Sequence, residues 1–286
     1  MNVLKTGFLL AALTALLVWI GQLIGGADGA TIAFGFALVM NLVTYWFSDK
    51  IVLAMYRAKP LTEAEGPRVY RAVREIATRT GMPMPKLYWL PTRTANAFAT
   101  GRSPKHAAVA VTSGLLEIMD DEELTGVLAH ELSHVRNRDT LVMTVAAALA
   151  GAIMWLARMA EWAVWMGGGR RDDGERRGGG GAQIVVMLLV AILAPLAAML
   201  IQMAISRTRE YGADEAGAKI SGNPQGLADA LEKLEASARA YPLPNANPAT
   251  AHLFIMNPLS GRALMNLFST HPPVEERIRR LRHMRL

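Results

Sequence analysis

The chain of 286 residues contains no cysteine, which excludes disulfide bonds and metal sites built from thiolates. Any metal ion must be held by histidine and carboxylate side chains, and the chain has only six histidines. Aromatic residues make up 7% of the sequence, and the basic residues behind the net charge of +6 are not interleaved with them. Because single-stranded nucleic acids are bound by aromatic stacking beside basic side chains, we expect no nucleic-acid partner.

Charge is missing from four long apolar runs, which are Gly7–Ala27, Ala30–Phe47, Thr140–Ala157 and Ala182–Ser206. Crossing a bilayer takes about 20 mainly apolar residues in a helix, so the sequence predicts about four transmembrane helices. A cleaved signal peptide is the alternative for the first run, but the second run follows with almost no spacer. Arg158 and Glu161 shorten the third run, so whether runs three and four cross fully stays open.

These runs divide the chain into four parts. Residues 1–49 form an N-terminal transmembrane hairpin, and residues 140–205 form a second hairpin interrupted by a glycine-rich loop at 167–181. Residues 50–139 and 206–286 are expected to form the two halves of one further domain. Lys50, Arg57 and Lys59 follow the second run, and basic residues favour the cytoplasmic side of a membrane.

The sequence of residues 50–139 predicts helices around a small sheet. Thr62 and Glu65 have the spacing of a helix-capping box, and apolar residues then recur at the helical period as far as Gly81. Three short β-prone runs follow, which are Lys86–Leu90, Ala95–Thr100 and Ala107–Thr112. We expect them to form an antiparallel sheet in a mainly α-helical fold. Asp120 or Asp121 is expected to cap the next helix.

That next helix carries the chemistry, because residues 130–134 read His-Glu-Leu-Ser-His. Residues four apart lie on one face of a helix, so His130 and His134 can bind the same Zn²⁺ ion. Glu131 lies close enough to act as the general base of a metalloprotease without being a ligand. Two unrelated surface histidines are the alternative, but the motif falls within a well-capped helix with apolar neighbours.

A third zinc ligand is expected after the fourth run. Glu210 supplies a carboxylate there, and Asp214 stands one helical turn further on. In a site with two histidines and one glutamate, the glutamate binds the metal, and a nearby carboxylate commonly accepts a hydrogen bond from a ligand histidine. We therefore predict Glu210 as a ligand and Asp214 as the partner of a ligand histidine. Two membrane crossings between His134 and Glu210 would return the chain to the same side.

The C-terminal part predicts a helix from Asn223 to about Arg239 and a basic final helix with an apolar stripe. The arginines of the final helix are expected to form a solvated face. Between these helices, Phe254, Ile255 and Met256 form an apolar triplet in a loop. They either pack beneath the loop or cover the catalytic cleft.

The sequence resembles the HtpX-type membrane zinc endopeptidases, which are relatives of the CAAX prenyl proteases. The matching segments are Asn96–Gly101, His130–His134 with Asn137 and Asp139, Ser206–Asp214, Asn247–His252, Asn257–Gly261 and Phe268–Pro273. The resemblance extends over nearly the whole chain and departs at no ligand position. The glycine-rich loop is longer than is typical of the family.

The resemblance implies a zincin-type catalytic domain facing the cytoplasm from a bacterial inner membrane, with one Zn²⁺ per chain. It implies cleavage of misfolded or damaged membrane proteins, as part of quality control under stress. It further implies that Asn96, Ala97, Phe98 and Ala99 belong to an edge strand that pairs with an extended substrate. His271 would stabilise the oxyanion, although the residue pattern alone fits a turn-capping histidine equally well.

Two other functions fit the sequence less well. An intramembrane protease would place the metal within the bilayer, but the charged residues on both sides of the motif would be costly there. A transporter or scaffold with a structural metal needs no glutamate after the first histidine, and the chain lacks a transporter's repeat symmetry. The sequence does not specify the oligomeric state, the physiological substrates, the cleavage preference or a regulator.

Overall fold

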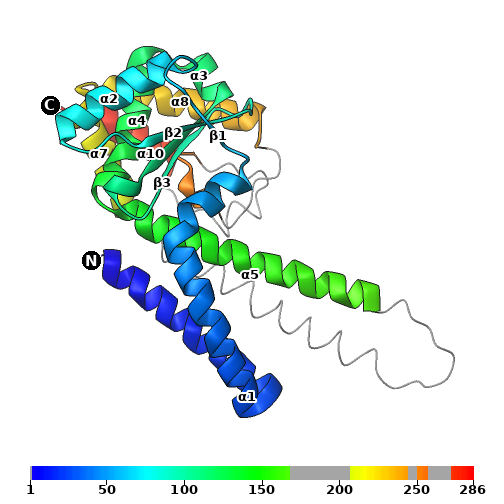
Figure 1. The fold of residues 1–286 in the computed structure, drawn as a ribbon. Helices are drawn as coiled ribbons and strands as arrows, with labels where there is room; N and C mark the ends of the chain where they lie inside the picture. The colour runs from blue at the N-terminus through cyan, green and yellow to red at the C-terminus, as the bar shows by residue number, and fades with distance from the viewer. Residues whose placement is uncertain (1, 168–206, 244–249, 257–271) are drawn as a thin grey trace.

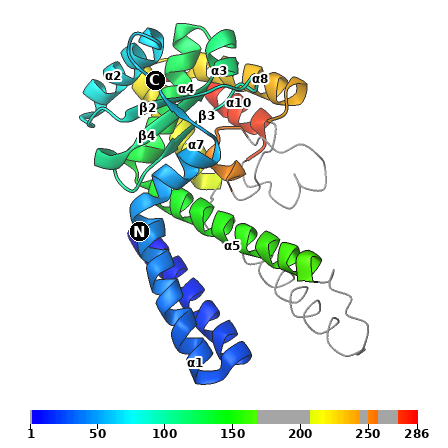
Figure 2. The ribbon, with the colours of Figure 1, turned by 45° about the vertical axis from the view of Figure 1, so that its right-hand side comes forward.

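The structure is a computed structural model that describes residues 2–167, 207–243, 250–256 and 272–286. A lobe of helices and strands stands at one end, and long helices extend away from it (Figures 1 and 2). The helices of four or more residues are α1 (Asn2–Met55), α2 (Pro67–Thr80), α3 (Ser113–Ile118), α4 (Asp121–Arg136), α5 (Asp139–Gly167), α7 (Arg207–Ser221), α8 (Pro224–Ala240) and α10 (Val274–Arg282). The strands are β1 (Lys59–Pro60), β2 (Lys86–Leu90), β3 (Ala97–Thr100) and β4 (Ala108–Thr112). Two 3₁₀ turns are η1 (Pro104–His106) and η2 (Ala251–Leu253).

Helix α1 is a hairpin of two helical arms that reverse at Gly25 and Gly26 (Figure 1). Gly26 has a positive φ of 61°, which costs a glycine little. Near the reversal the arms touch through backbone, since a side chain at Gly21 would lie 2.4 Å from the carbonyl oxygen of Gly29. Further along, the Asn41 amide donates to the Thr14 hydroxyl at 2.8 Å. The polar contact within apolar arms fixes their register.

One arm of the hairpin meets the requirements of a membrane span. Among the described residues, only Gly25–Met55 is both long and apolar enough to cross a bilayer, judged by length and composition. The first arm and the start of α5 are shorter apolar helices, at Thr6–Gln22 and Asp139–Gly151. The prediction of about four spans therefore remains a prediction, and the fourth apolar run lies outside the described residues.

The sheet is mixed, so the prediction of an antiparallel sheet is wrong. Its strand order is β1-β2-β4-β3, with β2 and β4 parallel and the other two pairs antiparallel. After β2 the chain crosses to the far edge of the sheet and forms β3 there. The next strand, β4, then inserts between β2 and β3. Strand propensities and turn residues predict where strands occur, but they do not specify this order of insertion. As a result β3 is an edge strand.

Each face of the sheet covers a different apolar cluster. On one face, side chains from β3 and β4 pack with α2, α4 and α8, as in the buried group of Val109, Leu128 and Leu231. On the other face, Phe98 and Ala110 pack with Val52 near the end of α1 and Met143 of α5. The lobe is thus attached to the apolar arms through the second face, which leaves the first face to position α4.

The caps of the helices are partly as expected. Asp120 is the N-cap of α4, and the reciprocal hydrogen bonds between Asp120 and Glu123 complete a capping box. Thr62 and Glu65 also bond to each other, but they form a turn before α2, whose N-cap is Gly66. Pro67 starts that helix because its fixed φ and missing N–H suit the first helical position.

Candidate active site

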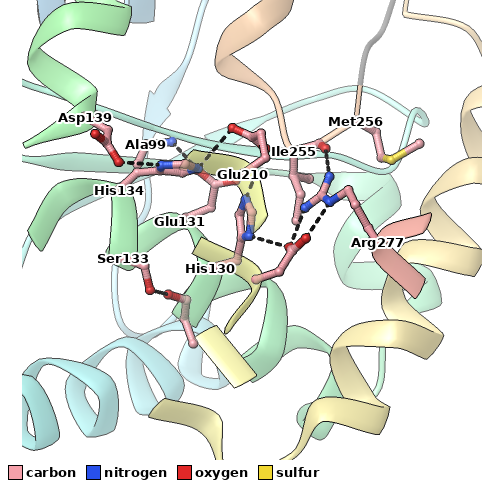
Figure 3. Close-up of polar contacts among 12 residues, drawn as sticks. Ala99, His130, Glu131, Ser133, His134, Asp139, Glu210, Ile255, Met256 and Arg277 are labelled. Carbon is pink, nitrogen blue, oxygen red and sulfur yellow. Dashed lines mark hydrogen bonds and ion pairs between the residues drawn. The ribbon is translucent and has the colours of Figure 1, made fainter. Parts of the chain in front are cut away.

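Helix α4 brings the histidine motif into the interior of the lobe. His130, Glu131 and His134 are all at most 3% exposed, and the two imidazole rings lie with centroids 4.9 Å apart (Figure 3). The spacing of three to four residues per turn puts both rings on one side of α4, as the sequence predicts. The pair is therefore preorganised on a rigid element.

Helix α7 supplies the carboxylate that faces these rings. Glu210 Oε1 lies 3.4 Å from His134 Nε2, and Glu210 Oε2 lies 3.8 Å from His130 Nε2. The close approach of α7 to α4 depends on Gly217, where an added Cβ would lie 2.9 Å from the backbone nitrogen of His130. One atom from each of His130, His134 and Glu210 lies within 4.8 Å of the others.

The far side of His130 is held by a buried acid. His130 Nδ1 lies 2.9 Å from Asp214 Oδ1, which leaves Nε2 directed toward Glu210. Burial lowers the pKa of His130 below its ordinary value, against the opposing effect of Asp214. A neutral imidazole with Nδ1–H donating to Asp214 presents a lone pair at Nε2, the state that binds a metal ion.

Asp214 in turn is paired with a buried arginine. Arg277 on α10 donates to both carboxylate oxygens, with Nε at 2.8 Å from Oδ2 and Nη2 at 2.7 Å from Oδ1 (Figure 3). Burial alone would raise the pKa of Asp214, but the Arg277 charge and its hydrogen bonds hold that pKa well below its usual range. Asp214 is therefore ionised, as an acceptor for His130 must be.

His134 has its own carboxylate partner, Asp139 at the start of α5. Nδ1 of His134 lies 3.3 Å from Asp139 Oδ2. Burial lowers the pKa of His134, but the charge of Glu210 and the bond to Asp139 outweigh it and raise the pKa to about 8. Both histidines thus share one arrangement, in which Nδ1 faces an acid and Nε2 faces Glu210.

Glu131 points between the metal-binding cluster and the sheet edge. Its Oε2 accepts a hydrogen bond from the backbone N–H of Ala99 at 2.8 Å. Burial, supported by the nearby charge of Glu210, raises the pKa of Glu131 to about 8, while His134 opposes the rise. A carboxyl group with a pKa in this range can both take up and release a proton near neutral pH.

The edge of β3 next to Glu131 is already in contact with the chain itself. The Ala97 carbonyl accepts from the backbone N–H of Ile255 at 3.1 Å. The Asn96 side chain donates to the Met256 carbonyl at 2.9 Å and accepts from its N–H at 3.3 Å. The expected edge strand is therefore present, but its outer positions beside Ala97 are paired.

Of the predicted site residues, the structure brings together His130, Glu131, His134, Glu210 and Asp214, with Asn96–Ala99 alongside. His271 lies outside the described residues.

Sequence reasoning did not assign roles to Asp139 and Arg277. The prediction that the arginines of α10 form a solvated face is wrong for Arg277, which is fully buried. The signal was available, because Arg277 falls three residues after Val274 and four before Leu281, within the apolar stripe.

The donor set fits a zinc ion. His130 Nε2 is buried and makes no hydrogen bond to any described residue, so this ring nitrogen is available to a cation. Two imidazoles with one carboxylate form a known catalytic zinc set, in which a fourth position stays open. Each imidazole is oriented by an acid at its other nitrogen, which is the usual support of zinc-binding histidines.

Comparison with known proteins places the chain in a family. The model of peptidase family M48 matches residues 63–285. A protease HtpX homolog from Syntrophobacter fumaroxidans is 61% identical over 280 residues, covering 98% of both chains. Another, from Thermococcus sibiricus, is 57% identical and covers 98% of this chain and 94% of its own.

The fold also resembles a solved structure. The crystal structure of S. mikatae Ste24p matches with a TM-score of 0.54 at 19% identity. The match covers 98% of this chain, which spans 64% of the Ste24p chain. The likeness concerns the fold alone, whereas the family match and the near-full-length relatives rest on sequence. With its buried His-His-Glu cluster, the chain therefore belongs to peptidase family M48 and is a zinc metallopeptidase.

Proposed function

We propose that the protein is an endopeptidase of the cytoplasmic membrane surface, which cleaves misfolded or damaged membrane proteins. The observation that carries this proposal is a buried His130–His134–Glu210 cluster with Glu131 beside it, in a lobe attached to an apolar hairpin. A metal-dependent peptide-bond hydrolase needs a Lewis acid with a base beside it. The apolar hairpin of α1 would hold this lobe at the membrane surface.

In this proposal His130, His134 and Glu210 hold one zinc ion. The chemistry that a zinc ion held there would supply is polarisation of the scissile carbonyl and acidification of an attacking water molecule. Glu131, which the backbone N–H of Ala99 holds beside the cluster, would take the proton from that water and deliver it to the leaving amine. Asp214 and Asp139 hold the two imidazoles in position.

The substrate is proposed to bind as an extended strand along Asn96, Ala97, Phe98 and Ala99. Antiparallel addition to an edge strand recognises backbone rather than side chains, so it suits an enzyme with many substrates. In β3 the polar backbone groups of Ala97 and Ala99 face away from β4, toward Ile255 and Glu131. A bound strand would thus lie directly beside the base. His271 is the proposed donor to the oxyanion.

The membrane placement rests on α1 and its flanks. The second arm exposes large apolar side chains along its length, including Ile32, Phe34 and Val39, as a lipid-facing helix would. At its lobe end the Arg102 guanidinium stacks over the Trp46 ring, 4.2 Å from its centroid, which suits the water–lipid boundary. Helix α4, which carries His130 and His134, lies in the lobe beyond that end (Figure 2), and this disfavours an intramembrane site.

The orientation and the number of crossings are further parts of the proposal. The basic residues after the second arm favour a cytoplasmic lobe. The division of the chain stands as proposed, with residues 1–49 and 140–205 in the membrane and residues 50–139 and 206–286 in the lobe. Because α5 packs against α1 through buried aliphatic residues such as Leu9 and Leu149, the third run stands beside the hairpin.

The test compares the parent protein with Glu131→Gln in a bilayer. Both should bind one zinc, and only the parent should cut a destabilised helical membrane protein placed in the same nanodiscs. Glu122→Gln, an exposed carboxylate on the same helix, is the matched control and should cleave like the parent. Cleavage by Glu131→Gln at the parental rate would refute the assignment of the base. A parent that cuts stable and destabilised targets alike would refute the quality-control role.

A further inference from the structure

Residues 254–256, here named the covering segment, add a short stretch of extended chain to the edge of β3. Phe254 has extended backbone angles and forms an antiparallel bridge with Phe98. The next residue, Ile255, donates its backbone N–H to Ala97. The segment therefore lies along the same strand edge, and in the same antiparallel sense, as the extended substrate of the proposed function.

The contacts of the covering segment are largely made by backbone atoms. Ile255 N–H meets the Ala97 carbonyl at 3.1 Å, and both polar backbone groups of Met256 bond to the Asn96 side chain. Because every peptide carries the same N–H and carbonyl groups, another extended chain can form these bonds equally well. The pairing stops short of Ala99, whose N–H is bound to Glu131.

Side chains anchor the segment on both faces of the sheet. Phe254 is 1% exposed and packs edge-on against Phe98 and Tyr56, with ring centroids 5.0 Å away in each case. Ile255 is equally buried and packs into the cluster on the α4 side. Just before the segment, His252 Nε2 lies 3.0 Å from the Met143 carbonyl of α5. The segment is thus a built-in element of the lobe.

A further bond connects the covering segment to the metal cluster. Arg277 Nη1 donates to the Ile255 carbonyl at 3.0 Å, while its other nitrogens hold Asp214 (Figure 3). Asp214 is the partner of His130. The Ile255 carbonyl is therefore connected to the metal-binding imidazole of His130 through two side chains, those of Arg277 and Asp214.

We propose that the covering segment is an intramolecular competitor, which a polypeptide substrate must displace from Asn96 and Ala97 before cleavage. The proposal rests on the proposed function and adds a restraint to it. A chain that is free to become extended can take over the vacated hydrogen bonds, whereas a folded helix or loop cannot. The restraint thus favours unfolded segments as substrates and keeps the site covered in their absence.

The absence of native cysteine permits a direct test. The Phe98–Phe254 bridge places Ala97 opposite Ile255, and opposed residues in antiparallel pairs have the Cα separation of a disulfide. The double variant Ala97→Cys with Ile255→Cys should retain zinc in both redox states. The reduced double variant is the reference: oxidation should abolish its cleavage of an unfolded polypeptide, and reduction should return the rate to the value that this variant had before oxidation. Full activity of the oxidised, cross-linked form would overturn the proposal.

A second variant distinguishes the loss of the competing segment from a general loss of folded structure. Phe254→Ala weakens the anchor, so KM for an unfolded substrate should fall several-fold while kcat is unchanged, as for removal of a competitor. Leu243→Ala removes a buried side chain of the same apolar cluster that belongs to neither the covering segment nor β3, and it should leave KM unaltered. An unchanged or increased KM in zinc-loaded Phe254→Ala overturns the proposal, even if both forms of the double cysteine variant are inactive. Lack of cleavage by the zinc-loaded parent refutes the proposed function instead.

Discussion

Replacing Arg277 with methionine tests how the metal cluster is supported. The substitution removes a guanidinium whose side chain is fully buried, and it keeps most of the aliphatic volume. Asp214 remains, with its own side chain only 6% exposed, and it loses both bonds that hold its charge in the interior. Its remaining partner among these contacts is His130.

The expected loss follows from the burial of the pair. Removing one member of a buried ion pair costs about 3–5 kcal/mol, because the other charge is left uncompensated. Loss of support for a ligand histidine lowers metal affinity by about 10–100-fold. Arg279→Met is the matched control on the same helix, since Arg279 is 68% exposed and its ion pair with Glu276 lies at the surface. An exposed pair contributes about 0–1 kcal/mol.

Two measurements decide the outcome. Urea unfolding of the metal-free proteins gives the stability difference, and competition with a zinc chelator gives the affinity. Arg277→Met should lose both stability and zinc affinity, whereas Arg279→Met should resemble the parent. If the two variants unfold at the same urea concentration and bind zinc equally well, Arg277 does not support the cluster.

Three other predictions concern the same site. Asp139→Asn should weaken zinc binding by about 10–100-fold in chelator competition, because His134 loses its charged acceptor; unchanged affinity would exclude this role. Gly217→Ala should destabilise the protein by about 1–3 kcal/mol, since its Cβ would meet the His130 backbone, whereas Gly212→Ala on the same helix meets nothing within 4 Å and should be neutral or stabilising in thermal unfolding. In the metal-free protein the pKa values of His134 and Glu131 are raised from 6.5 and 4.5 to about 8, so the folded state binds more protons and stability should fall as pH rises from about 6.5 to 8. The His134 part alone is worth about 2 kcal/mol in urea unfolding, and zinc, which displaces the metal-facing proton of His134, should remove this part of the dependence.

The metal cluster could be predicted from sequence because its determinants are local. The motif at 130–134 fixes two imidazoles and a base on one helix face, and Asp120 marks where that helix begins. Glu210 and Asp214 are likewise one helical turn apart, so the prediction of a helix there puts both carboxylates on the same side of it. The apolar arms of α1 follow from uncharged runs alone.

Features that depend on tertiary placement could not be predicted in the same way. The strand runs were recognisable, but the insertion of β4 between β2 and β3 depends on packing against α4 and the end of α1. Arg277 looked like one more arginine in a basic helix, and only the apolar stripe around it indicated burial. The covering segment was visible as an apolar triplet, yet its pairing with β3 joins residues about 160 positions apart.

Arg277 contacts both the metal cluster and the covering segment. One edge of its guanidinium holds Asp214, which orients His130, and Nη1 holds the Ile255 carbonyl. Displacing Ile255 from Nη1 leaves a buried donor that needs another acceptor, and an incoming peptide supplies one only if it is extended along β3. A poorly placed chain would leave that donor unpaired beside the acid that positions a metal ligand. If the covering segment is displaced as proposed, the fit of the substrate backbone and the geometry of the metal cluster are linked through this single side chain.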